Sequence, residues 1–184
     1  MNKRTKRIYI SGAIGLLLII AVVLLYLFQF QHRTFTDKKN GFSLEYPADW
    51  EVLKDHAGAP VQLRSPLDGA LDVFYENVTV IVQDISQEPM TLSDYSDKAI
   101  WQMEVVFMQN FVLEESTALA TLSGYPAYKV IFTGLGPDTE IMYYMTWTVL
   151  NKTKVYQVVY TALPSQFEKY YPVVERMLAS FKIF

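Results

Sequence analysis

Apolar residues follow two different patterns along this chain. The first is a continuous run that begins at Ile8, ends at Phe30 and holds no charged residue in 23 positions. After residue 34, apolar residues instead alternate with polar ones or recur at helical spacing, as they do in a folded domain. A helix of about 20 apolar residues crosses the roughly 30 Å core of a bilayer. The patterns therefore predict a transmembrane helix within residues 1–34 and one domain over residues 35–184.

The charges beside the apolar run predict its orientation. Four basic residues precede it: Lys3, Arg4, Lys6 and Arg7. Because positive charge stays on the cytoplasmic side, we expect a cytoplasmic basic tip, a signal anchor and an extracytoplasmic domain. The alternative is a cleaved signal peptide, which has an apolar region of about 7–15 residues and a small-residue cleavage site. The longer run and the absence of such a site favour an uncleaved anchor in the cell membrane.

Alternating positions predict strands in the first half of the domain. Phe42, Leu44 and Tyr46 alternate with polar residues, and Pro47 ends their strand. The Asn-Gly pair within residues 38–41 predicts a hairpin turn before it. Similar patterns predict an irregular loop at 66–76 and strands at 35–37, 50–52, 61–64 and 77–84.

A helix is predicted over residues 91–111, where Thr91 and Asp94 form a capping pair. One face carries the stripe expected in the core: Leu92, Tyr95, Ala99, Met103, Val106 and Phe107. A second apolar group falls on nearly the opposite face: Trp101, Val105 and Met108. This second group is either covered by the loop at 66–76 or forms a docking face for a protein partner, and the pattern leaves both open.

The last third of the chain predicts a meander of long strands and a closing helix. The strands are expected at 113–122, 125–133, 139–150 and 155–162. The third of them is apolar on both sides, which indicates a sheet covered on both faces. Ser165 and Glu168 resemble a capping box for the helix, and Pro172 either kinks it or marks its first turn. Its apolar stripe is Phe167, Tyr170, Tyr171, Val174, Met177, Leu178 and Phe181.

These elements predict an α+β fold. Its centre is an antiparallel sheet of about six to seven strands flanked by helices on both faces, preceded by one transmembrane helix. A domain of this size buries about 68–70% of its unfolded surface and needs no cross-links, which agrees with a chain that lacks cysteine.

The charge of the chain is divided between its two parts. Residues 1–34 hold five basic and no acidic residues, so a net charge of −3 for the whole chain leaves −8 on residues 35–184. Nucleic acids require a basic footprint, so this balance argues against them as partners. It also argues against a domain that lies flat on an anionic lipid surface.

The residues offer little for catalysis or metal binding. A serine nucleophile needs a positioned base, and the only histidine inside the domain is His56, in a polar loop. No phosphate-binding glycine motif is present. Asp68 and Asp72 flank Gly69 and are weak candidates for a calcium site, because their spacing lacks the EF-hand pattern. The sequence therefore predicts neither an enzyme nor a cofactor.

The order of several short motifs resembles the PsbP-like family, named for an extrinsic subunit of photosystem II. The matches are residues 41–50 (GFSLEYPADW), 77–80 (NVTV), 124–128 (GYPAY) and 180–183 (SFKI). The resemblance covers residues 35–184, and its opening G-F-x-x-x-Y-P-x-x-W is the most specific part. It implies a central antiparallel sheet between helices and non-catalytic roles in docking onto larger assemblies or retaining metal ions. Neither His32 nor His56 matches a family metal ligand.

The sequence thus predicts a membrane-anchored, non-catalytic extracytoplasmic domain. We expect it to bind a protein partner or to stabilise an envelope complex, with Trp101, Val105 and Met108 as the candidate partner face. The alternative is a surface protein that binds a small ligand or a metal ion in a pocket between sheet and helix.

Overall fold

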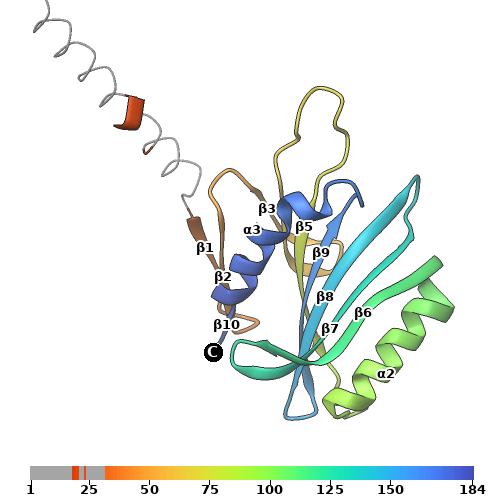
Figure 1. The fold of residues 1–184 in the computed structure, drawn as a ribbon. Helices are drawn as coiled ribbons and strands as arrows, with labels where there is room; N and C mark the ends of the chain where they lie inside the picture. Colours follow the sequence, from red (N-terminus) through yellow and green to blue (C-terminus); the bar gives the residue numbers. More distant parts are fainter. Residues whose placement is uncertain (1–17, 21–22, 24–31) are drawn as a thin grey trace, which may run out of the picture.

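A computed structural model describes residues 18–20, 23 and 32–184, whose strands form two antiparallel sheets (Figure 1). The large sheet has seven strands, in the spatial order β3 (Glu51–His56), β4 (Ala59–Arg64), β5 (Asn77–Asp84), β9 (Lys154–Ala162), β8 (Glu140–Leu150), β7 (Tyr125–Leu135) and β6 (Gln109–Leu122). The small sheet has three, in the order β1 (His32–Asp37), β2 (Phe42–Pro47) and β10 (Lys182–Ile183). The central antiparallel sheet is confirmed, whereas the separate small sheet was not predicted.

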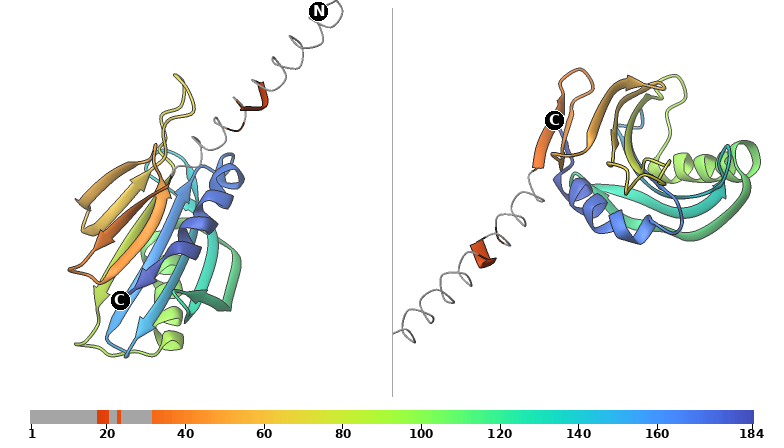
Figure 2. Two further views of the ribbon diagram at one scale, coloured as in Figure 1. Left: turned by 90° about the vertical axis from the view of Figure 1, so that its left-hand side faces the viewer. Right: turned by 90° about the horizontal axis from the view of Figure 1, so that it is seen from above.

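Two helices cover opposite faces of the large sheet, α2 (Leu92–Gln102) and α3 (Phe167–Ser180) (Figure 2). Side chains that alternate along β8 separate the two faces, since Tyr144 packs in the cluster under α3 and Trp147 in the cluster under α2. The predicted coverage of both faces is therefore correct. The small sheet shares the α3 side, where Phe42 of β2 stacks on Phe181 with ring centroids 5.6 Å apart.

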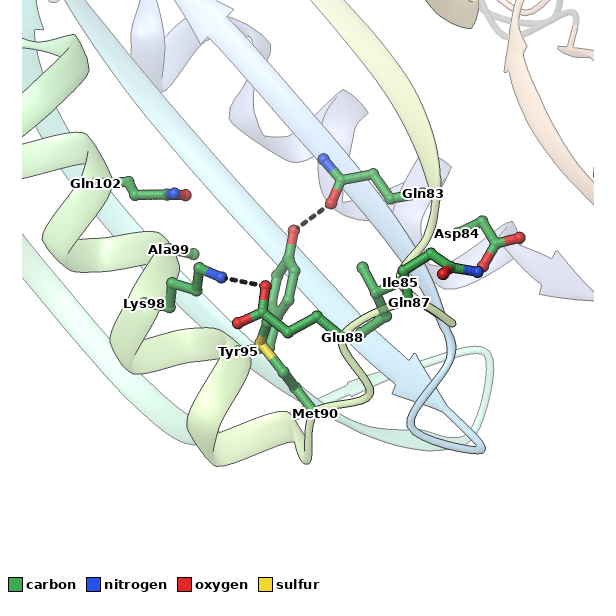
Figure 3. A pocket seen from close by; sticks show the side chains of 10 residues that line it. All are labelled: Gln83, Asp84, Ile85, Gln87, Glu88, Met90, Tyr95, Lys98, Ala99 and Gln102. Atoms are coloured by element: carbon green, nitrogen blue, oxygen red, sulfur yellow. Dashed lines mark hydrogen bonds and ion pairs between the residues drawn. The ribbon is translucent and has the colours of Figure 1, made fainter.

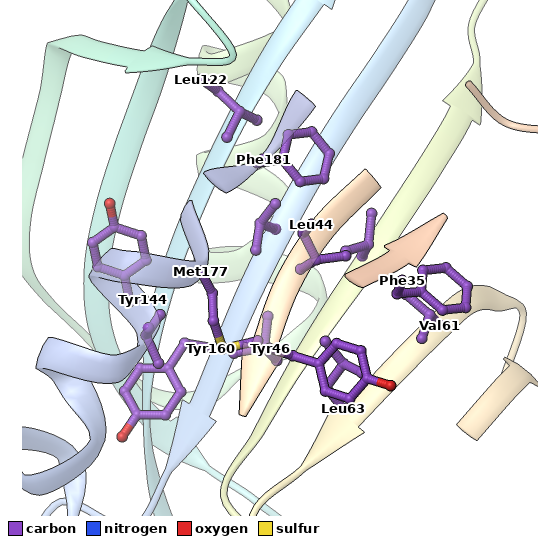
Figure 4. Close-up of a cluster of buried hydrophobic side chains, with 14 of the residues drawn as sticks. Phe35, Leu44, Tyr46, Val61, Leu63, Leu122, Tyr144, Tyr160, Met177 and Phe181 are labelled. Carbon is purple, nitrogen blue, oxygen red and sulfur yellow. The ribbon is translucent and has the colours of Figure 1, made fainter. Parts of the chain in front are cut away.

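The larger core cluster lies between α3 and the two sheets (Figure 4). Phe42, Leu44 and Tyr46 enter it from β2, as their alternation predicts. From the predicted stripe of the last helix, the fully or largely buried residues are Phe167, Tyr170, Val174, Met177 and Phe181. The stripe is thus confirmed by burial.

The start of α3 differs from the prediction. A turn at residues 164–166, closed by the Gln166 N–H to the Leu163 carbonyl at 2.9 Å, delays the helix until Phe167. The helix cap is Gln166, without a side-chain hydrogen bond, so the capping box of Ser165 and Glu168 is wrong. Pro172 lies inside the helix rather than in its first turn.

The hairpin between β1 and β2 ties the end of the chain to the large sheet. Gly41 adopts a φ of +76° in this turn, and its carbonyl accepts the Phe184 N–H at 3.0 Å. The neighbouring Asn40 carbonyl accepts the Tyr156 hydroxyl at 2.7 Å and the Lys154 ammonium at 3.0 Å. The predicted Asn-Gly turn is confirmed, and it joins both sheets to the C-terminus.

The predicted transmembrane run from Ile8 to Phe30 lies largely outside the described residues. Among residues 18–20, 23 and 32–184, no helix has the length and apolarity needed to cross a membrane.

Candidate functional site

One side of α2 is fixed tightly to the large sheet. Trp147 of β8 packs edge-on against Tyr95, with centroids 6.3 Å apart, and stacks on Tyr128 of β7 at 5.6 Å. The Thr91 and Asp94 side chains form the predicted capping box at the start of the helix. Aromatic packing therefore fixes the inner side of α2 against the sheet, and the outer side of the helix faces away from the sheet.

The helix ends earlier than the sequence pattern predicts. After Gln102 the chain widens into a π-helical turn, η1 (Met103–Phe107), closed by the Met108 N–H to the Met103 carbonyl at 3.0 Å. Met108 is extended and β6 starts at Gln109, so the prediction of a helix to residue 111 is wrong. An i to i+5 turn changes the angular spacing of side chains. Val106 and Phe107, predicted in the core, are consequently exposed at 56% and 68%.

Four large apolar side chains are exposed together at this corner of the domain. Trp101 and Val105 are exposed at 55% and 61%, and Val106 and Phe107 follow directly in the chain. We call Trp101, Val105, Val106 and Phe107 the η1 face. The next strand adds the exposed Val112 and Leu113. A group of exposed apolar residues from one short segment and the strand after it marks an interaction site more often than isolated exposed residues do.

The structure brings two of the three predicted face residues together. Trp101 and Val105 share the outer side, whereas Met108 turns inward and is half-buried against the cluster that contains Phe132. The Met108 sulfur lies 3.3 Å from the position that a Cβ would take at Gly134. The cause is the π-helical turn, because it removes Met108 from the helical wheel on which the three residues coincide.

The loop at 66–76 does not cover the η1 face. Asp68 holds this loop on α3, where it pairs with the Lys169 ammonium and accepts the Tyr170 hydroxyl at 2.9 Å. Figure 1 shows the loop rising from β4 and β5, away from α2. Of the two alternatives that the sequence left open for Trp101, cover by this loop is therefore wrong.

The strand beside the η1 face is the edge of the large sheet. β6 pairs with β7 through three register shifts, and Asn110 near its start has a φ of +55°. Bulges of this kind discourage the addition of another strand to a sheet edge. A partner at this corner would therefore be bound through side chains rather than through the backbone of the edge strand. The exposed carboxylates of Glu104 and Glu114 border the apolar surface.

The two acidic residues proposed for calcium organise their own loop. Both Asp68 oxygens are engaged by Lys169 and Tyr170, and the hydrogen bond from Lys169 lowers the pKa of Asp68. Asp72 accepts the backbone N–H groups of Asp68 at 2.8 Å and Phe74 at 3.1 Å. Within the described part of the chain, no three histidine or carboxylate side chains are grouped as metal ligands.

A buried carboxyl that the sequence pattern did not reveal lies at the base of the same loop. Glu76 has no exposed surface, and its Oε2 accepts the Ser65 hydroxyl at 3.3 Å. Its Oε1 has no hydrogen-bond partner among the residues that the structure describes. Burial raises the pKa of Glu76, and the nearby charge of Asp72 raises it further. A single acidic residue after an irregular loop reads as solvated, so no sequence signal marks this burial.

A pocket of about 290 Å³ lies between α2 and the segment after β5 (Figure 3). Its polar groups pair with one another. The Tyr95 hydroxyl donates to Gln83 Oε1 at 2.7 Å, and Lys98 pairs with Glu88 at 2.7 Å. Burial raises the pKa of Tyr95 to about 12, so the phenol is neutral at physiological pH. Because these groups satisfy each other, the pocket lacks the convergent polar set typical of a ligand site.

The histidine that the sequence placed in a polar loop is exposed to solvent. His56 is exposed at the end of β3, with its Nε2 3.3 Å from an Arg64 guanidinium nitrogen.

Comparison with known proteins places this fold in a family. Three similar structures, each matched by 83% of this chain, have low sequence identity. They are cyanobacterial PsbP from Synechocystis sp. PCC 6803 (17% identity, TM-score 0.60, 92% of its chain), LpqN of Mycobacterium tuberculosis, involved in cell envelope biogenesis (15%, 0.62, 90%), and the Ran-binding protein Mog1p of Saccharomyces cerevisiae (10%, 0.54, 95%). Among curated protein sequences, none matches significantly. The family model for PsbP matches residues 31–183, nearly all of the described domain, and the chain therefore belongs to the PsbP family.

Proposed function

We propose that this chain is a membrane-anchored, non-catalytic protein whose domain lies outside the cytoplasm and binds another protein through the η1 face. The observation that carries the proposal is the exposure of four large apolar residues within seven positions, Trp101, Val105, Val106 and Phe107, where the inner side of the helix packs on the sheet. Tryptophan at the centre of such a surface is a frequent hot spot of protein–protein binding.

The charges around the η1 face favour a protein over a lipid surface. Glu104 borders the η1 face and Glu114 follows Leu113 on β6, and both are exposed. Residues 35–184 carry −8 in total, since the whole chain carries −3 and residues 1–34 carry +5. An anionic bilayer would repel this surface. The partner we propose presents an apolar patch bordered by lysine or arginine side chains.

The fold is used for binding in other proteins. The yeast structure is that of a Ran-binding protein, and the mycobacterial one is involved in cell envelope biogenesis. These likenesses supply the fold and not the partner, because a fold hosts different functions. They support a binding domain, and the η1 face supports its location on this chain.

The anchor is proposed from the sequence. A run of 23 uncharged positions from Ile8 to Phe30, preceded by four basic residues within residues 1–7, favours insertion with the N-terminus in the cytoplasm. The partner would then be an envelope protein or the outer part of a membrane complex.

Site-specific photo-crosslinking in living cells tests the proposal. A photoreactive residue replaces Trp101 or Val105 in the full chain, and Leu119 serves as the control because it is an exposed aliphatic residue, at 94%, farther along β6. We expect one and the same protein at positions 101 and 105 and not at 119, and we expect the purified pair to bind each other. Equal capture at all three positions, or none by a folded domain, would contradict the proposal.

A further inference from the structure

We infer that the loop at residues 66–75 forms a second contact with the bilayer that holds the anchor, with Leu71 and Val73 at the boundary of headgroups and acyl chains. We call this loop the apolar finger. The inference rests on the membrane anchorage proposed above and adds a site that is separate from the η1 face.

The apolar finger is a built structure. Its base is closed by the Ser65 N–H to the Glu76 carbonyl at 2.8 Å, which continues the pairing of β4 with β5. Its middle is shaped by the Asp72 carboxylate, which accepts two backbone N–H groups of the loop. Its side is held on α3 by Asp68. These contacts hold the tip away from the core.

The tip of the finger is apolar and uncovered. Leu71 is exposed at 96% and Val73 at 89%. Tyr75, near the base, is also exposed, and the Arg64 guanidinium lies 5.8 Å from its ring centroid. Tyrosine and arginine are amphipathic side chains that suit the headgroup region, below which aliphatic side chains are favourable.

The finger and the start of the domain lie at the same end of the molecule. His32, the first residue of β1, pairs with Pro47, whose carbonyl accepts the Trp50 N–H at 3.1 Å. The Trp50 ring lies 6.1 Å from that of Tyr170, which donates to Asp68 of the finger. Figures 1 and 2 show from two directions that the loop projects from the end at which β1 begins. His32, the described residue nearest in sequence to the predicted anchor, therefore lies at this end.

The charge of the finger is compatible with a bilayer. Asp68 is paired with Lys169, and the Asp72 carboxylate, the other charge of the finger, accepts two backbone N–H groups of the loop. The η1 face differs, because its carboxylates are exposed at its border. A tether also raises the effective concentration of the finger at the surface, to about the millimolar range for short linkers, so a small apolar contact is enough.

Fluorescence quenching on the full chain tests the inference. The chain has no cysteine, so Leu71→Cys, Val73→Cys and the control Leu119→Cys each carry a single environment-sensitive label. The protein is reconstituted at low density into phosphatidylcholine vesicles with a minor share of phosphatidylglycerol. We expect labels at 71 and 73 to be several-fold less accessible to iodide than the label at 119, and to be quenched by nitroxide lipids. Pure lipid vesicles exclude a partner protein as the cause.

Two results would overturn the inference, and they are distinguishable. Protein that floats with the vesicles while the labels at 71 and 73 remain as accessible to iodide as the label at 119 would leave the anchor intact and refute the lipid contact. Protein that does not float with the vesicles would refute the anchor, and the finger contact with it. Circular dichroism of each labelled variant establishes that the domain is folded.

Discussion

The indole N–H of Trp147 on β8 donates a hydrogen bond of 2.9 Å to the hydroxyl of Ser96 on α2. Both residues are fully buried, and Ser96 in turn donates to the Leu92 carbonyl at 2.6 Å. This contact determines the rotation of α2 about its axis. Trp101 follows Ser96 by about 1.4 helical turns, which places it on the outward side. The same hydrogen bond that orders the core therefore presents the proposed binding surface.

Removal of this hydrogen bond is expected to destabilise the domain. Ser96→Ala leaves the Trp147 N–H buried without a partner, which costs about 1–3 kcal/mol of unfolding free energy. Urea denaturation measures the loss. Ser93→Ala is the matched control on the exposed side of α2, with an expected change within about 0.5 kcal/mol. Equal effects of the two substitutions would show that the contact does not order the helix.

The two tryptophans are expected to respond differently to truncation. Trp147→Ala empties a fully buried site and should cost about 3–5 kcal/mol. Trp101→Ala removes a side chain that is 55% exposed, so we expect a change of about 0.5 kcal/mol or less. Chemical denaturation compares them. A loss of several kcal/mol in Trp101→Ala would mean that Trp101 belongs to the core rather than to a binding surface.

Glu76 is expected to make stability depend on pH. Burial raises its pKa in the folded state above the ordinary value of 4.5, so folding favours the protonated form. Its contribution is complete at low pH and is lost as the pH rises through the raised pKa. Glu76→Gln should remove this loss and be more stable than the original chain at neutral pH by about 1 kcal/mol.

The comparison of the two proteins isolates Glu76. Asp37 and Asp68 have pKa values lowered by their hydrogen-bond partners, although burial of Asp37 acts in the opposite direction. Their contribution falls as the pH decreases and is common to both proteins. The difference in unfolding free energy between Glu76→Gln and the original chain, measured from pH 4 to 8, should therefore grow with pH. A constant difference would contradict a raised pKa of the buried carboxyl.

Two glycines with nearly equal φ angles test whether the C-terminus packs on the turn between β1 and β2. Gly41 and Gly124 have φ values of +76° and +78°, so alanine at either position costs about 1–2 kcal/mol. At Gly41 the added Cβ would also lie 2.7 Å from the Phe184 carbonyl oxygen, whereas at Gly124 no atom of the described residues lies within 4 Å. Thermal denaturation should show the larger loss for Gly41→Ala. Equal losses would mean that the C-terminus does not pack on this turn.

The periodicity of the chain predicted most of the fold. Alternation located β2, and helical spacing located the buried side of α3, because each of these two elements has one face in the core. The two-residue strand β10 was missed because it is too short to show a period. β10 forms by pairing with β2, and the two strands lie near opposite ends of the domain sequence.

The candidate surface was predicted only in part. Trp101 and Val105 were found because they lie on a regular helix, opposite its core stripe. Val106, Phe107 and Met108 were misplaced because a π-helical turn has the same residue types as an α-helix but a different angular spacing. The sequence pattern left open whether the apolar finger covers α2, because its position depends on the pairing of Asp68 with Lys169 across 101 residues of sequence.

The affinity of the captured partner for the domain tests the central claim most directly. The protein crosslinked at position 101 is purified, and its binding to the original domain, to Trp101→Ala and to the control Leu119→Ala is measured by titration calorimetry. Truncation of a hot-spot tryptophan costs about 2 kcal/mol or more, which raises Kd by at least about tenfold. We predict this loss for Trp101→Ala with unchanged stability, and no change for Leu119→Ala. Equal affinity for all three proteins would refute the η1 face as the binding surface.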